Sequence, residues 1–182
     1  MSNNAARILI ILAAIVAAAA LRLVPHPPNF TPIGAMALFS GAMLGRRGIL
    51  ALAAPLGALL LSDLVLGLFY PGMAFVYSGV ALVVLIGWLV AAKRSIFAVG
   101  VAALASSIAF FVLTNFGMWL FSGLYPLTAS GLAACYVAAI PFFQNSLAGD
   151  LFYSGVLFGG FALLERAVPQ LRPSVATSPA HR

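Results

Sequence analysis

Apolar runs long enough to cross a membrane recur along the whole chain, and no other feature limits its fold so strongly. A helix needs about 20 apolar residues to cross roughly 30 Å of bilayer hydrocarbon, and in lipid the backbone must form its hydrogen bonds within such helices. The sequence therefore predicts an all-α fold, a polytopic membrane protein in which six transmembrane helices form a bundle. The predicted spans are residues 7–24, 30–44, 49–69, 73–92, 96–121 and 141–164.

The low charge content leaves no room for a soluble domain. Of the 182 residues, 64% are hydrophobic and only 7% are charged, too few to cover the surface of a soluble protein. We assign residues 1–168 to one transmembrane domain, with a short amphipathic helix near 132–139 in the loop before the last span. The first span lacks a clean small-residue cleavage site, so we expect it to be retained. Residues 169–182 are rich in proline and serine, which predicts a disordered cytoplasmic tail.

The basic residues predict how the helices are oriented. With six crossings, Arg22 lies alone on one side of the membrane and the other eight basic residues lie on the opposite side. Cytoplasmic loops carry the excess of Lys and Arg, so we expect both termini in the cytoplasm. The net charge of +6 then reflects orientation and does not indicate a nucleic-acid partner. The eight residues are Arg7, Arg46, Arg47, Lys93, Arg94, Arg166, Arg172 and Arg182.

The second span is the weak point of this topology. Its fifteen residues, 30–44, reach only about 22 Å as a helix, less than the hydrocarbon thickness. If this segment were re-entrant, five spans would remain and Arg7 would lie alone opposite the other basic residues. That charge bias is equally strong, so charge does not separate the two topologies. We expect six crossings, because local bilayer thinning accommodates a short helix at modest cost.

Polar residues inside the predicted spans collect in the halves that face the outside. Asp63 lies near the outer end of the third span, Asn115 near that of the fifth, and Asp150 in the outer half of the sixth. The cytoplasmic halves are almost entirely Ala, Leu, Val, Gly and Phe. Polar side chains in lipid need a partner or a cavity, so this asymmetry indicates a small-molecule site at the outer face. The residues expected to bind the molecule are His26, Asn29, Asp63, Tyr77, Asn115, Trp119, Tyr125, Asn145, Asp150 and Tyr153.

The two acids within the spans need compensation. A carboxylate in a span costs about 2.5–3.5 kcal/mol even on insertion scales, and Arg22 is the only basic residue on the outer side. Asp63 or Asp150 is therefore expected to lack a cation, and a proton, a bound cation or a donor group of the ligand would fill that gap. The alternative for each acid is a structural contact within the bundle.

The stretch PHPPNFTPIGAMALF, residues 25–39, is stiff and polar for a link between spans. Prolines flank His26 on both sides, and a residue that precedes proline is held in extended conformation. An already ordered link loses little entropy when it closes over a ligand. We expect it to form one wall of the site, with His26 as a polar contact. A single cysteine excludes a disulfide and any multi-cysteine metal site, and no metal or cofactor is predicted.

Small residues lie four apart on the first span, Ala13 with Ala17 and Ala14 with Ala18. This spacing lets helix backbones approach closely in lipid. The two pairs either pack within the bundle or form a surface that docks a partner membrane protein.

Four segments resemble a family of bacterial transport proteins, namely RLVPHPPNFTPIGAMALFSGA, LLLSDLVLG, FFVLTNFGMW and YPLTASGLAACYVAAIPFFQNSLAGDLFYSGVLFGG. The chain is also similar to the substrate-binding S-components of energy-coupling-factor vitamin transporters, nearest to the solitary cobalamin-type S-components. The resemblance implies six helices, a site near the outer face and outer loops that close over a vitamin. It also implies a surface for the coupling subunit, formed by Ala13, Ala14, Ala17 and Ala18.

On the same resemblance, His26, Asp63 and Tyr77 would surround a corrin ring. The sequence departs from that group because the fourth span, residues 73–92, contains no cysteine to bind cobalt. Cys135 lies in a different element, so direct thiolate ligation of cobalt is not expected.

These features together predict a membrane transport protein that binds a vitamin-like molecule, with cobalamin or another corrinoid as a candidate, and mediates its uptake. The chain has no GxxxxGK[ST] phosphate loop, so the energy would come from a shared coupling subunit with its ATPases or from a gradient. The alternative is a membrane scaffold or assembly protein of similar fold. No spacing of acid, base or nucleophile indicates an enzyme.

Overall fold

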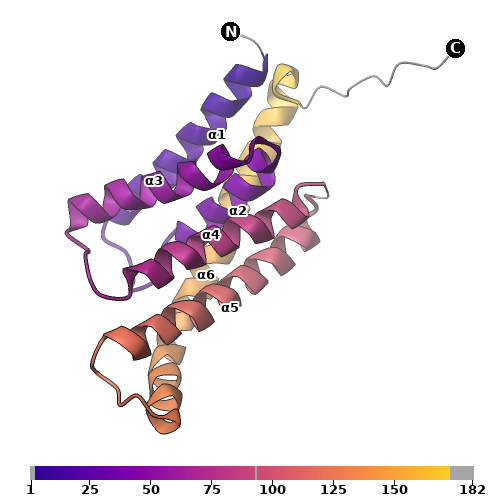
Figure 1. Ribbon diagram of the computed structural model, residues 1–182. Coiled ribbons are helices and arrows are strands. Elements are labelled where there is room, and N and C mark those ends of the chain that lie inside the picture. Colours follow the sequence, from indigo (N-terminus) through magenta and orange to yellow (C-terminus); the bar gives the residue numbers. More distant parts are fainter. Residues whose placement is uncertain (1–2, 93, 173–182) are drawn as a thin grey trace, which may run out of the picture.

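Helices account for nearly all of the computed structural model, which describes residues 3–92 and 94–172. These residues form six α-helices and contain no strand, which confirms the predicted all-α fold (Figure 1). Three single-turn 3-10 helices extend them. The elements are α1 (Asn3–Ala20), η1 (Leu21–Leu23), α2 (Ile33–Leu44), η2 (Gly45–Arg47), α3 (Ile49–Leu66), α4 (Met73–Val90), α5 (Ile96–Phe121), α6 (Ala129–Ala167) and η3 (Pro169–Leu171).

Successive helices run in opposite directions along the bundle (Figure 1). The start of α1 and the end of α6 consequently lie at the same end of the molecule, which we call the terminal end. The opposite end carries the α1–α2 link, residues 24–32, and is called the link end. Five of the described helices are long and apolar enough to cross a membrane: α1 with η1, α3, α4, α5 and α6.

The short helix α2 lies at the centre of the bundle. It packs against all five other helices, and nine of its twelve residues are buried. Twelve residues rise only about 18 Å, less than the hydrocarbon thickness. Because the other helices surround it, α2 meets protein over most of its surface, so its short length exposes little backbone to lipid.

Glycines allow α2 and α4 to approach each other closely where they cross. A Cβ added to Gly87 would lie 3.0 Å from the Ala42 nitrogen and 3.0 Å from the Gly41 Cα. A Cβ added to Gly41 would lie 2.9 Å from the carbonyl carbon of Val84. Small residues give such backbone contact between helices in lipid, where packing replaces the hydrophobic effect as the driving force. This crossing holds α2, and with it the link that precedes α2.

The outward faces of the bundle are apolar. Leu89, Ile96 and Phe97 leave 82%, 95% and 82% of their surface exposed, and many other large apolar side chains are also exposed. A soluble protein rarely shows so extensive an apolar surface. The exposed faces therefore fit a lipid environment, and the protein is a helical membrane bundle.

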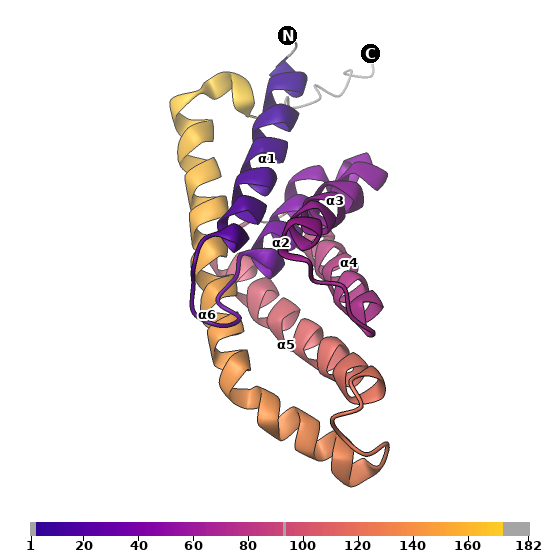
Figure 2. The same ribbon diagram turned by 90° about the vertical axis from the view of Figure 1, so that its left-hand side faces the viewer.

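The last helix differs from the prediction. The expected short helix near 132–139 and the expected span from Pro141 form one continuous helix, α6, of 39 residues. Its first turn is capped by Thr128, whose hydroxyl accepts a hydrogen bond from the Gly131 N–H at 3.1 Å. Pro141 removes one backbone donor and favours bending without ending a long helix that neighbours support. α6 curves along its length (Figure 2).

The ordered part of the chain also extends past the predicted domain boundary at residue 168. Pro169–Leu171 form η3, and the Leu171 side chain is buried. The Arg7 guanidinium donates a hydrogen bond to the Leu171 carbonyl, which ties η3 to α1. The first residues assigned to the tail, 169–171, therefore form a helix, and residues 173–182 lie outside the described residues.

Candidate small-molecule site at the link end

A cavity of about 650 Å³ opens at the link end of the bundle. The link, the α3–α4 loop and the helices α4, α5 and α6 all contribute to its wall. Two neighbouring phenylalanines on α5 and two on α6 form its aromatic part, namely Phe110, Phe111, Phe142 and Phe143. Four of the predicted site residues line it: His26, Asn29, Asn115 and Asp150.

Asp63 lies behind the cavity wall, in a buried cluster. Its Oδ1 accepts a hydrogen bond from Arg22 Nη1 at 2.9 Å, and its Oδ2 accepts one from the Tyr77 hydroxyl at 3.0 Å. Arg22 also donates to the hydroxyl of Ser62. The side chains of Arg22 and Asp63 are 9% and 6% exposed, so the ion pair is almost completely removed from solvent. Arg22 itself lines the cavity. Asp63 and Tyr77 therefore hold Arg22 in position and do not face the cavity themselves.

Asp150 finds its partners on α5 and at the start of α2. Its Oδ2 accepts a hydrogen bond from the Ser107 hydroxyl at 2.6 Å, and the backbone N–H of Ala35 also interacts with the carboxylate. The residue at the N-cap position of α2 is Pro32, which has no side-chain acceptor to cap the helix. The free N–H groups and the positive dipole of a helix N-terminus stabilise a carboxylate. Asp150 thus caps α2 from a neighbouring helix.

This arrangement changes what was expected of the two acids. Arg22 neutralises Asp63, and the N-terminus of α2 compensates Asp150. Asp63 therefore follows the structural alternative. Asp150 pairs with no cation among the residues that the structure describes and lines the cavity, so a proton, a bound cation or a ligand donor at Asp150 stays a prediction.

The link is held against α6 by three kinds of contact. The Asn145 amide donates a hydrogen bond to the Pro28 carbonyl at 2.9 Å. The Phe30 ring packs on Tyr153, with ring centroids 5.5 Å apart. Gly149 brings α6 so close that a Cβ there would lie 3.2 Å from the Thr31 nitrogen. Asn145 and Tyr153 were both predicted to bind the molecule. In the structure they hold the link against α6.

His26 and Asn29 are the polar groups that the link presents. The His26 ring nitrogen Nδ1 lies 3.0 Å from the Pro27 carbonyl, within its own turn. Asn29 has a positive φ of 61°, a conformation that asparagine tolerates better than most residues. Both residues line the cavity.

Three further residues that the sequence singled out lie in or near the α5–α6 turn: Trp119 near the end of α5, Tyr125 in the turn and Cys135 in α6. The Trp119 indole donates to the Pro126 carbonyl at 2.9 Å, and the Cys135 thiol lies 3.5 Å from the Asn115 carbonyl. Neither Trp119 nor Tyr125 is part of the cavity wall. Trp119 lies in the last turn of α5, and Tyr125 lies in the turn that joins the two helices.

One family model matches residues 2–171, a range that includes all six helices and both ends of the bundle. The chain belongs to the DUF6580 family. The description of DUF6580 is a family of unknown function, so membership adds no activity. No curated protein and no solved structure matches the chain. The function of this DUF6580 member must therefore be argued from its geometry.

Sequence reasoning missed several groups that line the cavity. Arg22 was considered only as a counter-ion, and Ser107, Tyr70 and the four phenylalanines were not considered. The paired phenylalanines at 110–111 and 142–143 are a visible signal, because they lie on consecutive spans. Burial raises the pKa of the Tyr70 phenol above its ordinary value, and the Asp63 carboxylate raises it further while Arg22 opposes this. Tyr70 therefore stays a neutral hydrogen-bonding group at physiological pH.

The four alanines predicted to meet a partner do not share one face. Ala18 is buried in the bundle, and Ala14 is half-buried and packs against the core. Ala13 and Ala17 are exposed. Of the predicted surface, only the pair Ala13 and Ala17 is therefore exposed.

The contact between Gly34 and Asp150 should be visible in a double-mutant cycle. A Cβ on Gly34 would lie 2.8 Å from Asp150 Cγ, so Gly34→Ala displaces the carboxylate from the N-terminus of α2. We expect Gly34→Ala and Asp150→Ala each to cost about 1–2 kcal/mol, seen as a drop of several degrees in thermal midpoint. The double variant should fall little below Asp150→Ala alone, because the methyl group then meets no carboxylate. Gly57→Ala, where the new Cβ has open space, is the control. Additive losses would contradict the capping role of Asp150.

Proposed function

We propose that the protein binds a vitamin-like small molecule in the link-end cavity and mediates its uptake across a bacterial inner membrane. The observation that carries this proposal is the cavity itself, which joins aromatic walls to a guanidinium, an imidazole and two amides. Small-molecule sites commonly have volumes of about 300–1,000 Å³, apolar walls and a few polar groups. A volume of about 650 Å³ falls within that range.

The lining suggests a flat, conjugated molecule with hydrogen-bonding groups at its edge. The phenylalanines of α5 and α6 supply an aromatic wall, and Arg22 can pair with an anionic or carbonyl group of the ligand. Asn115 donates its amide N–H to the Phe111 carbonyl of its own helix at 2.8 Å, which leaves its amide oxygen as an acceptor for the ligand. This volume favours a compact vitamin over a complete corrinoid, which would extend beyond the cavity.

Uptake requires a partner that supplies energy. We propose a shared coupling subunit and its ATPases, in line with the resemblance to S-components, and the exposed pair Ala13 and Ala17 is the surface on α1 open to such a subunit. The orientation proposed from the basic residues puts the terminal end in the cytoplasm. The cavity then opens to the periplasm, where the stiff link closes over the molecule.

Gently solubilised protein should carry its ligand through purification. We expect mass spectrometry to detect a co-purifying vitamin-like molecule, and a panel of vitamins and corrinoids to raise the thermal midpoint for the matching compound. His26→Ala and Asn115→Ala should each weaken its binding about tenfold, the value of one hydrogen bond to the ligand. Asn4→Ala, an exposed asparagine at the terminal end, is the matched control.

A membrane scaffold is the second candidate, and one observation favours it. Asp63 and Asp150 both find partners within the protein, as expected if polar residues serve only assembly. A scaffold needs no ligand in the cavity. A purified protein that carries no small molecule and ignores every compound of the panel would contradict transport and favour this alternative.

A further inference from the structure

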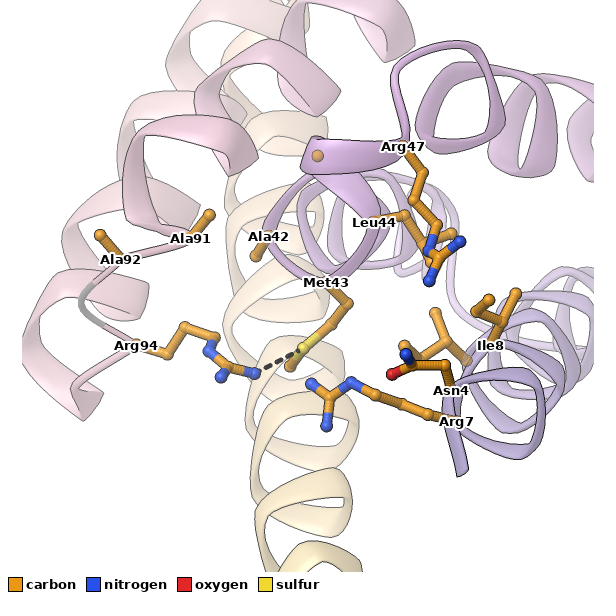
Figure 3. Close-up of a pocket in the computed structure, with 12 residues that line it drawn as sticks. Asn4, Arg7, Ile8, Ala42, Met43, Leu44, Arg47, Ala91, Ala92 and Arg94 are labelled. Atoms are coloured by element: carbon orange, nitrogen blue, oxygen red, sulfur yellow. Dashed lines mark hydrogen bonds between the residues drawn. The ribbon is translucent and has the colours of Figure 1, made fainter. Parts of the chain in front are cut away.

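A second cavity, of about 530 Å³, lies at the terminal end of the bundle, remote from the link. The start of α1, the end of α2 with η2, and the segment after α4 form its wall. Figure 3 shows that the guanidinium groups of Arg7, Arg47 and Arg94 point toward a common space between these elements. The basic residues were predicted to set orientation only, and their convergence on one cavity is a property of the tertiary structure.

One of the three arginines already has strong partners. Arg7 forms an ion pair with Glu165 and donates to the Leu171 carbonyl, and its guanidinium lies 5.0 Å from the centre of the Phe161 ring. Glu165 is the only carboxylate that pairs with any of the three arginines within the described part of the chain. Arg7 therefore acts mainly as a structural link between α1, α6 and η3.

The other two arginines are undercompensated. Arg94 lies 3.9 Å from the same Glu165 oxygen, at the limit of an ion pair, and its close contact is the Met43 sulfur at 2.9 Å. A thioether is only a weak acceptor. Arg47 has no hydrogen bond or ion pair with any residue that the structure describes. Two guanidinium groups thus offer unused donors to the cavity, and Glu165 pairs with only two of the three arginines.

The apolar part of the wall adds a second requirement. The cavity is also lined by Ile8, Ile11 and Leu44, so one region of its wall is charged and another is apolar. Guanidinium groups match phosphate oxygens with paired hydrogen bonds. Basic pockets between membrane helices bind the head groups of anionic lipids. We propose that this arginine pocket binds a phosphate group, supplied by the head group of an anionic phospholipid or by a soluble phosphate compound.

The site is independent of the link-end cavity and of transport. Phosphate binding would bridge α1, η2 and the α4–α5 turn, and so stabilise the terminal end of the bundle. It would also bias the membrane depth of that end if the phosphate belongs to a lipid. Arg7 is unsuitable for the test, because its replacement also breaks the contact with Glu165.

The test compares two double variants that remove the same charge. Arg47→Gln with Arg94→Gln alters the pocket, whereas Arg166→Gln with Arg172→Gln removes two arginines at the same end that do not line it. The proteins are placed in nanodiscs of phosphatidylcholine alone or with phosphatidylglycerol, and lipid retention is measured by native mass spectrometry. In a second arm, inorganic phosphate is titrated in phosphatidylcholine while the thermal midpoint is followed.

We expect the pocket variant to weaken phosphatidylglycerol retention about tenfold or more. Each arginine near a membrane surface adds to the attraction for anionic lipid, and this variant removes two of them. The control variant should retain the lipid. Stabilisation by inorganic phosphate alone, lost in the pocket variant, would support the site with a soluble source. Equal losses in both variants, or no response in either arm, would overturn the proposal.

Discussion

Replacing Asp63 by asparagine should lower the thermal midpoint of the purified protein by roughly 10 °C, because breaking a buried ion pair from one side costs about 3–5 kcal/mol. The change leaves the Arg22 guanidinium, which is 9% exposed, without its counter-charge. It also weakens the hydrogen bond that Tyr77 donates. Fluorescence-detected thermal unfolding in one detergent would measure the loss.

The double variant Arg22→Met with Asp63→Leu provides the control for this prediction. It removes both charges and replaces them with apolar side chains, so no buried charge is left uncompensated. We expect it to recover most of the stability lost in Asp63→Asn. A double variant as unstable as the sum of the two single changes would show that the ion pair is not the source of the loss.

The double variant Arg22→Met with Asp63→Leu also distinguishes transport from the scaffold function. If Asp63 holds Arg22 at the cavity wall, the stable double variant should still lose ligand binding, because the guanidinium is missing. If the protein is a scaffold, its function should return in the double variant together with its stability. The two readouts can therefore be compared in one protein.

Replacing Gly87 by leucine should have the second large effect, a drop of about 10 °C in thermal midpoint. The new side chain would meet the backbone of α2 at Ala42 and Gly41, which cannot move aside as a side chain can. Overpacking of this kind costs about 1–3 kcal/mol and more where backbone must shift. The substitution should also disturb the link-end cavity, because α2 follows the link directly and its N-terminus is capped by Asp150.

Gly155→Leu is the matched control for this substitution. Gly155 lies in α6, and a Cβ there has open space around it. The leucine would face the surroundings of the bundle, so its midpoint should stay within a few degrees of the parent protein. If Gly87→Leu were tolerated equally well, the close α2–α4 crossing would not hold the bundle together.

Much of the fold could be predicted because hydropathy is a local property. Each long apolar run became a helix, and the alternation of the helices followed from their number and short connections. The grouping of His26, Asn115 and Asp150 at one end followed in the same way, because depth along a span can be counted from its ends. The continuous α6 escaped prediction because Pro141 was taken as a start, although it lies inside a helix that its neighbours support.

Partners across helices could not be predicted, because they depend on how each helix is rotated. In a soluble helix, polar residues mark the exposed face, whereas a helix that is apolar on every side carries no such mark. The sequence therefore did not show that Ala18 turns inward while Ala17 is exposed, or that Gly34 makes room for Asp150.

By itself the sequence determined the apolar character of the helices, the helical class and the position of each polar side chain along its segment. Only the tertiary structure decided that Arg22 pairs with Asp63, that the start of α2 receives Asp150, and that Arg47 and Arg94 share a pocket. The reason is physical. Crossing lipid is a requirement that each segment meets alone, whereas packing selects one rotation for every helix against all of its neighbours together.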